Sequence, residues 1–99
     1  MNLLQQTINF LHHNDQLPTN VLYVAARNQY MSWDEFAIQA DTEYDNGYGS
    51  ANVHESVLVV GTDWWLERHE YDGSEWWEFK TQPTKPKQHN PQVSIFHTP

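Results

Sequence analysis

The chain has 99 residues and no cysteine, and its 13 Asp and Glu against 5 Lys and Arg give a net charge of −8. This length predicts a single domain, and the lack of cysteine excludes disulfides and thiolate metal sites. The negative charge argues against binding to nucleic acid or to anionic membranes, and no apolar stretch approaches the roughly 20 residues of a membrane span.

The acidic residues are concentrated in one part of the chain. Residues 34–78 hold twelve of the thirteen acids and only one base, Arg68. Such a local excess favours a partner with a basic surface, although solubility alone explains it equally well. The N-terminal residues lack the basic start and the small-residue cleavage site of a signal peptide, so we expect a cytoplasmic protein.

The first predicted element is an amphipathic helix over residues 2–15. Its apolar residues recur at helical spacing and form one stripe, which consists of Leu3, Leu4, Ile8 and Leu11. A short hairpin follows, with a strand over residues 21–26, a turn at residues 27–29 and a return strand at residues 30–32.

A second helix is predicted over residues 32–45. Ser32 and Glu35 have the spacing of a capping box, and Asp34 also lies near the positive helix end. The apolar face of this helix consists of Trp33, Phe36, Ala37, Ala40 and Tyr44.

The rest of the domain is predicted to be an antiparallel meander. Strands are expected at residues 55–60, 64–71 and 76–81, separated by short turns. The sequence therefore predicts an α+β domain over residues 1–82, with two helices packed in two layers on a small antiparallel sheet. Residues 83–99 hold four of the five prolines and predict an extended or disordered tail.

The hairpin "DWWLERHEYDGSEWWEF" has two possible registers. A two-residue Asp72-Gly73 loop opposes Glu70 to Glu75 and Glu67 to Glu78, and directly opposed like charges are destabilising. We therefore expect a four-residue loop, Asp72 to Glu75, which pairs Tyr71 with Trp76, His69 with Glu78 and Glu67 with Lys80.

Strand alternation divides the hairpin side chains between two faces. The predicted core face carries Trp64, Leu66, Trp77 and Phe79, with Arg68 and Glu70 toward the turn. The other face is aromatic and acidic, and it carries Trp65, Glu67, His69, Tyr71, Trp76, Glu78 and Lys80. Two interpretations stay open for this face: it is a recognition surface, or the N-terminal helix covers Trp65 and Trp76.

No motif predicts catalysis or a metal centre. The six histidines lack the spacing of a known zinc site, and the acids from Asp41 to Asp45 depart from the calcium-loop pattern. Neither a GxGxxG sequence nor a P-loop occurs. We expect no enzyme, cofactor or metal; a ligand-binding protein or small enzyme would need a concave pocket that the sequence does not indicate.

The segments "YMSWDEF", "YDNGYG" and "VVGTDWWLERHEYDGSEWWEFKTQP", which span Tyr30 to Pro83, resemble small acidic proteins encoded by bacteriophages and prophages. The resemblance implies a phage accessory protein, and proteins of that kind include inhibitors of host defence such as the anti-CRISPR proteins. The resemblance identifies no functional residues in this chain.

Two functional hypotheses follow from these observations. The first is an inhibitor that occupies the basic nucleic-acid groove of a CRISPR effector or another host nuclease, by mimicry of the DNA backbone, or that biases the conformation of the nuclease. The alternative is an interaction or homodimerisation module without inhibitory activity. The candidate partner-binding residues are Trp65, Glu67, His69, Tyr71, Asp72, Glu75, Trp76, Glu78, Asp41, Glu43 and Asp45.

Overall fold

The computed structural model describes residues 1–47 and 49–97 and has the predicted α+β fold. The elements in chain order are the helix α1 (Leu3–His13), the 3-10 turn η1 (Pro18–Asn20), the strands β1 (Tyr23–Ala26) and β2 (Gln29–Met31), the helix α2 (Trp33–Ala40), and the strands β3 (Leu58–Val60), β4 (Trp64–Tyr71) and β5 (Ser74–Thr81). None of the described helices is long and apolar enough to cross a membrane.

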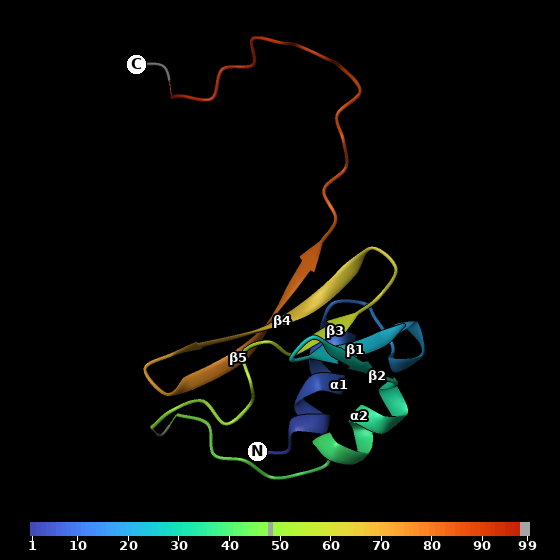
Figure 1. Cartoon of the computed structure of the whole chain (residues 1–99), viewed down its shortest axis with the longest axis vertical. Helices are drawn as coiled ribbons and strands as arrows, with labels where there is room; N and C mark the ends of the chain where they lie inside the picture. The colour runs from blue at the N-terminus through green and yellow to red at the C-terminus, as the bar shows by residue number, and fades with distance from the viewer. Residues whose placement is uncertain (48, 98–99) are drawn as a thin grey trace.

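All five strands form one antiparallel sheet in the order β2-β1-β3-β4-β5 (Figure 1). The first hairpin, β1–β2, is therefore joined to the C-terminal meander through the pairing of β1 with β3. In Figure 1 both helices lie below the sheet, and the C-terminal tail leaves above it.

One face of the sheet forms the core together with both helices. Val24, Val59 and Leu66 lie side by side on β1, β3 and β4, and all three are fully buried. The helix α1 adds Leu11 to this cluster, and α2 adds Phe36 and Ala40. The indole Nε1–H of Trp77 on β5 donates to Thr7 Oγ1 of α1 at 3.0 Å, which places α1 against the same face.

The N-terminal helix therefore does not cover Trp65 and Trp76. These two residues lie on the opposite face of the hairpin from Trp77, because successive side chains of a strand point to opposite sides. Trp76 is 38% exposed, whereas Trp77 is 2% exposed. Of the two interpretations that the sequence left open, the uncovered face is the one found in the structure.

The second helix begins where the sequence predicts and ends earlier. Ser32 Oγ accepts from the Glu35 N–H at 3.1 Å, and Glu35 Oε1 accepts from the Ser32 N–H at 2.9 Å, so the capping box is confirmed. The hydrogen bond from the Ser32 backbone is the main cause that lowers the pKa of Glu35. The helix stops at Ala40 because the following residues turn toward the N-terminus, where Glu43 forms a β-bridge with Asn2.

The predicted register of the hairpin is wrong. Asp72 and Gly73 form a two-residue turn, and β5 begins at Ser74 rather than at residue 76. Both turn residues have positive φ, 51° and 85°, as the type I′ turn of a two-residue hairpin requires, and Asp-Gly is a preferred pair for it. The shift moves the pairing by two residues, so every side chain keeps its predicted face.

The described part of the tail, residues 83–97, contains no helix or strand and is exposed throughout. Gln82, the residue between β5 and the tail, donates its N–H to Asp63 O at 2.9 Å, so the chain leaves the sheet in line with the strand.

Candidate functional site

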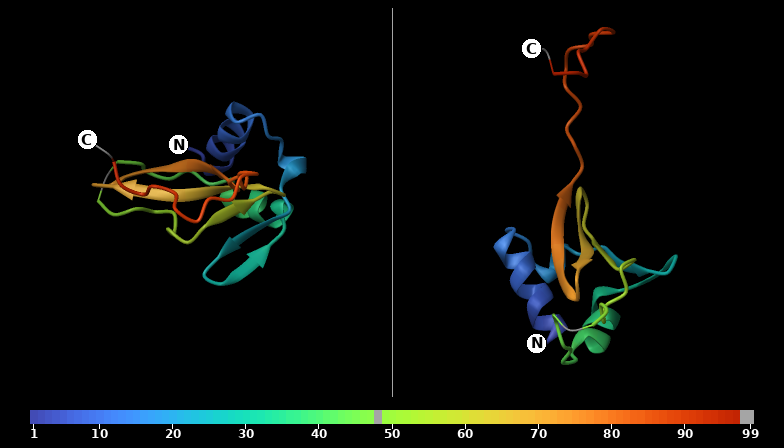
Figure 2. Two further views of the ribbon diagram at one scale, coloured as in Figure 1. Left: turned by 90° about the horizontal axis from the view of Figure 1, so that it is seen from above. Right: turned by 90° about the vertical axis from the view of Figure 1, so that its left-hand side faces the viewer.

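The strongest candidate site is the side of β4 and β5 that faces away from the helices, which we call the open face. Its side chains are those of Trp65, Glu67, His69, Tyr71, Trp76, Glu78 and Lys80. Tyr71 is 77% exposed near the hairpin tip, where Asp72 is also exposed. The left view of Figure 2 looks down on the sheet, with α2 behind it.

Two carboxylates lie directly opposite each other on the open face. Glu67 on β4 pairs with Glu78 on β5 in the register that the sequence argument rejected. His69 sits between them, with Nε2 3.8 Å from Glu67 Oε1 and Nδ1 3.6 Å from Glu78 Oε2. Lys80 Nζ lies 3.2 Å from Glu78 Oε1 and offsets part of the repulsion.

The indole of Trp76 is fixed beside this carboxylate pair. It stacks on the His69 ring, with 6.5 Å between ring centroids and 22° between the ring planes. Its Nε1–H donates to Glu78 Oε2 at 3.1 Å. This hydrogen bond, followed by the one from Lys80, lowers the pKa of the Glu78 carboxyl, so Glu78 carries its negative charge over a wider pH range than a free glutamate.

Two tyrosines on the first hairpin extend the same side of the sheet. Across the strands of the sheet, Tyr23 is aligned with Val60 and Trp65, and Tyr30 is aligned with Glu67. Their exposed fractions are 39% and 80%, and their rings meet edge to face at 6.2 Å between centroids. Sequence reasoning missed them, because only the pairing of β1 with β3 brings them onto this face.

Glu75 does not belong to the surface, contrary to the prediction. Its side chain is fully buried on the core face, and its Oε1 accepts from Arg68 Nη2 at 3.0 Å. The Asn52 and Val53 N–H groups also donate to this carboxylate, at 2.6 and 3.0 Å. Asn46 pairs with the Glu75 backbone in both directions, at 2.8 Å each. Glu75 therefore anchors the segment between α2 and β3.

The three acids after α2 are also separate from the open face. Asp41 accepts from Asn2 Nδ2 at 2.9 Å, and Glu43 forms an ion pair of 2.7 Å with the N-terminal amine of Met1. Asp45 is exposed on the same segment. These carboxylates lie beside the start of α1, on the helix side of the sheet, so the eleven candidate residues do not form one continuous surface.

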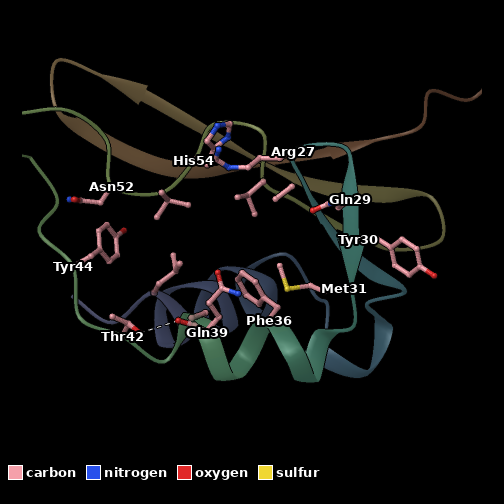
Figure 3. Close-up of a pocket in the computed structure, with 15 residues that line it drawn as sticks. Arg27, Gln29, Tyr30, Met31, Phe36, Gln39, Thr42, Tyr44, Asn52 and His54 are labelled. Carbon is pink, nitrogen blue, oxygen red and sulfur yellow. Dashed lines mark hydrogen bonds between the residues drawn. The ribbon is translucent and has the colours of Figure 1, made fainter.

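A cavity of about 590 Å³ opens between the start of α1, α2, the β1–β2 hairpin and the loop residues 42–44 and 52–57 (Figure 3). Its apolar lining includes Met31, Phe36 and Val57, and its polar lining includes Arg27 and His54. Figure 3 shows Tyr30 pointing away from it. This cavity could not be predicted from the sequence, because its walls come from four separate segments. Its mostly apolar lining is typical of small-molecule sites, but the exposed carboxylates and indole lie on the open face.

No group of three or more His, Asp or Glu side chains in residues 1–47 and 49–97 is arranged to hold a metal ion. Comparison of the chain with protein-family models, curated proteins and solved structures gives no match. The function is therefore argued from the geometry of the open face and from the charge of the chain.

Proposed function

We propose that the protein is a protein-binding module that uses the open face to bind a basic surface of a partner. The observation that carries this proposal is the direct opposition of Glu67 and Glu78 beside the half-exposed indole of Trp76. Opposed like charges reduce the stability of a sheet. A residue pattern that lowers stability on an uncovered face is most simply explained by a gain in binding.

The chemistry of the open face suits a partner rich in Lys and Arg. The two carboxylates accept charge-assisted hydrogen bonds from such side chains. Trp76 and Tyr71 each bury a large area on contact and keep a polar group available, which is why these residue types dominate binding energy at interfaces. The net charge of −8 steers the protein toward a basic partner over longer distances and away from nucleic acid.

The finer part of the proposal is that the partner is a host-defence nuclease of the CRISPR-effector class and that binding inhibits it. Such effectors hold nucleic acid in positively charged channels, which suit the acidic open face. The resemblance to phage-encoded proteins supports the same choice. The contact is expected in the host cytoplasm, where these nucleases act. The alternative is an interaction module of the same chemistry that inhibits nothing.

The test is DNA cleavage by purified CRISPR effectors in the presence of increasing amounts of the protein, at low and at high salt. The charge-reversed variant Glu67→Lys/Glu78→Lys is compared with Glu55→Lys, which changes an exposed acid outside the open face. We expect inhibition by the wild type and by the control, and at least a tenfold loss of potency in the double variant or at high salt.

Circular dichroism of the double variant checks that it is folded. Equal potency of all three proteins would show that the open face is not the binding surface. Capture of an effector without an effect on cleavage would retain the binding module and reject the inhibitor.

A further inference from the structure

The C-terminal tail has the charge opposite to that of the rest of the chain. Residues 1–82 contain all thirteen acids and three bases, a net charge of −10, whereas residues 83–99 contain Lys85 and Lys87 and no acid. The apolar tail residues Val93, Ile95 and Phe96 are 63%, 83% and 82% exposed. The tail is thus basic and apolar, which is the chemistry that the open face suits.

The start of the tail also has a regular spacing. Pro83 and Pro86 are three residues apart, and the polyproline II helix has three residues per turn, so both rings lie along one edge of an extended segment. Lys85 lies between them and Lys87 follows. Proline-rich segments of this kind dock on surfaces lined with aromatic side chains. On the open face such side chains are supplied by Trp65, Trp76 and Tyr71, next to two carboxylates for the lysines.

The tail of one copy extends from the body and does not pack on its own open face (Figure 1). Gln82 is held in the sheet by its hydrogen bond to Asp63 O, and a residue before proline favours an extended backbone. The ring of Pro83 fixes the next φ angle. Both restraints favour an extended start of the tail, and Figure 1 shows the tail running away from the body.

We propose that the open face binds the C-terminal tail of a second copy of this chain, with Pro83–Lys87 against Trp76 and with Lys85 and Lys87 paired with Glu67 and Glu78. Each copy offers one face and one tail, so a reciprocal exchange closes a symmetric dimer. This inference rests on the proposed function of the open face as a binding surface for basic segments. A host partner that binds the open face therefore has to displace the tail of the second copy.

The test is a charge swap in the full-length protein. The mass is measured by light scattering and analytical ultracentrifugation over a range of concentrations and at two salt concentrations. We expect a dimer for the wild type and for Glu55→Lys. We expect dissociation constants raised on the order of tenfold for the face variant Glu67→Lys/Glu78→Lys and for the tail variant Lys85→Glu/Lys87→Glu. The protein with all four changes is expected to recover the wild-type dimer.

Several results would overturn the inference. These are a monomer at every concentration, a dimer that persists in both the face variant and the tail variant, or a protein with all four changes that does not recover the dimer. A dimer that is lost only in Trp76→Ala indicates pairing of two open faces instead. If the face variant loses inhibition of the effector but keeps its oligomeric state, this inference fails and the proposed function stands. If the face variant keeps both its inhibition of the effector and its oligomeric state, this inference and the proposed function both fail.

Discussion

At the scale of single residues, Arg68 and Glu75 form an ion pair whose side chains are almost fully buried. The guanidinium lies between the rings of Tyr44 and Trp77, 5.6 and 4.8 Å from their centroids. It also donates through Nη2 to Tyr44 Oη at 2.8 Å. Its Nε and Nη1 have no hydrogen-bond partner among the described residues, so the Arg68 charge depends on Glu75 and on the two aromatic faces.

Removal of the Glu75 carboxylate is expected to destabilise the fold strongly. Glu75→Ala leaves the Arg68 charge buried without its anion and frees the N–H groups of Asn52 and Val53. Loss of one partner of a buried pair costs about 3–5 kcal/mol in the free energy of unfolding. Urea denaturation followed by tryptophan fluorescence measures it.

The matched control is Glu70→Ala, because Glu70 lies directly opposite Glu75 in the hairpin and is exposed. Its effect should stay within about 0.5 kcal/mol, as for an ordinary surface position. Equal effects of the two substitutions would contradict the anchoring role of Glu75.

Glu78 gives a pH prediction. Its pKa in the folded protein is lowered, first by the Trp76 indole and then by Lys80, so the ionised form favours the folded state. The resulting stabilisation is present above the pKa of an unfolded glutamate, about 4.3, and is lost as the pH falls through the lower pKa of the folded state.

Urea denaturation of the wild type and of Glu78→Gln from neutral to acidic pH tests this. The difference in unfolding free energy between the two proteins should be largest at neutral pH and should shrink as the pH falls. A difference that is independent of pH would contradict the assigned hydrogen bonds.

At the scale of elements, the β4–β5 hairpin shows how turn chemistry can outweigh charge. In the sequence, two opposed carboxylate pairs disfavour the two-residue turn. In the folded chain Glu75 is neutralised in the interior by Arg68, and Glu78 is neutralised in part by Lys80. The repulsion is therefore removed at the Glu70–Glu75 pair and offset only in part at the Glu67–Glu78 pair, and the Asp-Gly turn determines the register.

The turn itself is testable through Gly73. A Cβ at this position meets the Gly49 carbonyl oxygen at 2.8 Å, and φ is +85°, a region that L-residues rarely adopt. Gly73→Ala is expected to lower the free energy of unfolding by about 1–2 kcal/mol or more. Thermal and urea denaturation give this value.

Asp72→Asn is the control for Gly73→Ala, because asparagine tolerates a left-handed backbone and Asn-Gly suits the same turn. It should leave stability nearly unchanged. If Gly73→Ala were as stable as this control, the turn would not have the described conformation.

The sequence predicted the faces of the hairpin better than its pairing. An error of two residues in register preserves the alternation, so Trp76 and Glu78 were placed correctly on the outer face while every partner was wrong. The burial of Glu75 could not be predicted, because it depends on donors from Asn52 and Val53, more than twenty residues away in the chain. The cavity and the contribution of Tyr23 and Tyr30 escaped prediction for the same reason: both depend on long-range pairing.

At the scale of the whole molecule, charge is divided between a compact acidic body and an extended basic tail. The radius of gyration is 16.9 Å, against about 13 Å for a compact domain of 100 residues, and the tail accounts for the difference. The sequence predicted the extended tail from its prolines, but it did not predict the division of charge. Composition did not indicate on which side of the sheet the tail departs, because that depends on how β5 ends.

The two hydrogen bonds between the Asn46 side chain and the Glu75 backbone oppose aggregation of the protein. β5 is an eight-residue strand at the edge of the sheet, and exposed edges of this length are templates for strand addition and fibril growth. The Asn46 amide occupies the hydrogen-bonding positions of that edge at Glu75, where the next molecule's strand would begin to pair. One side chain thus takes the place of a neighbouring strand at Glu75 and blocks strand addition at this end of the edge.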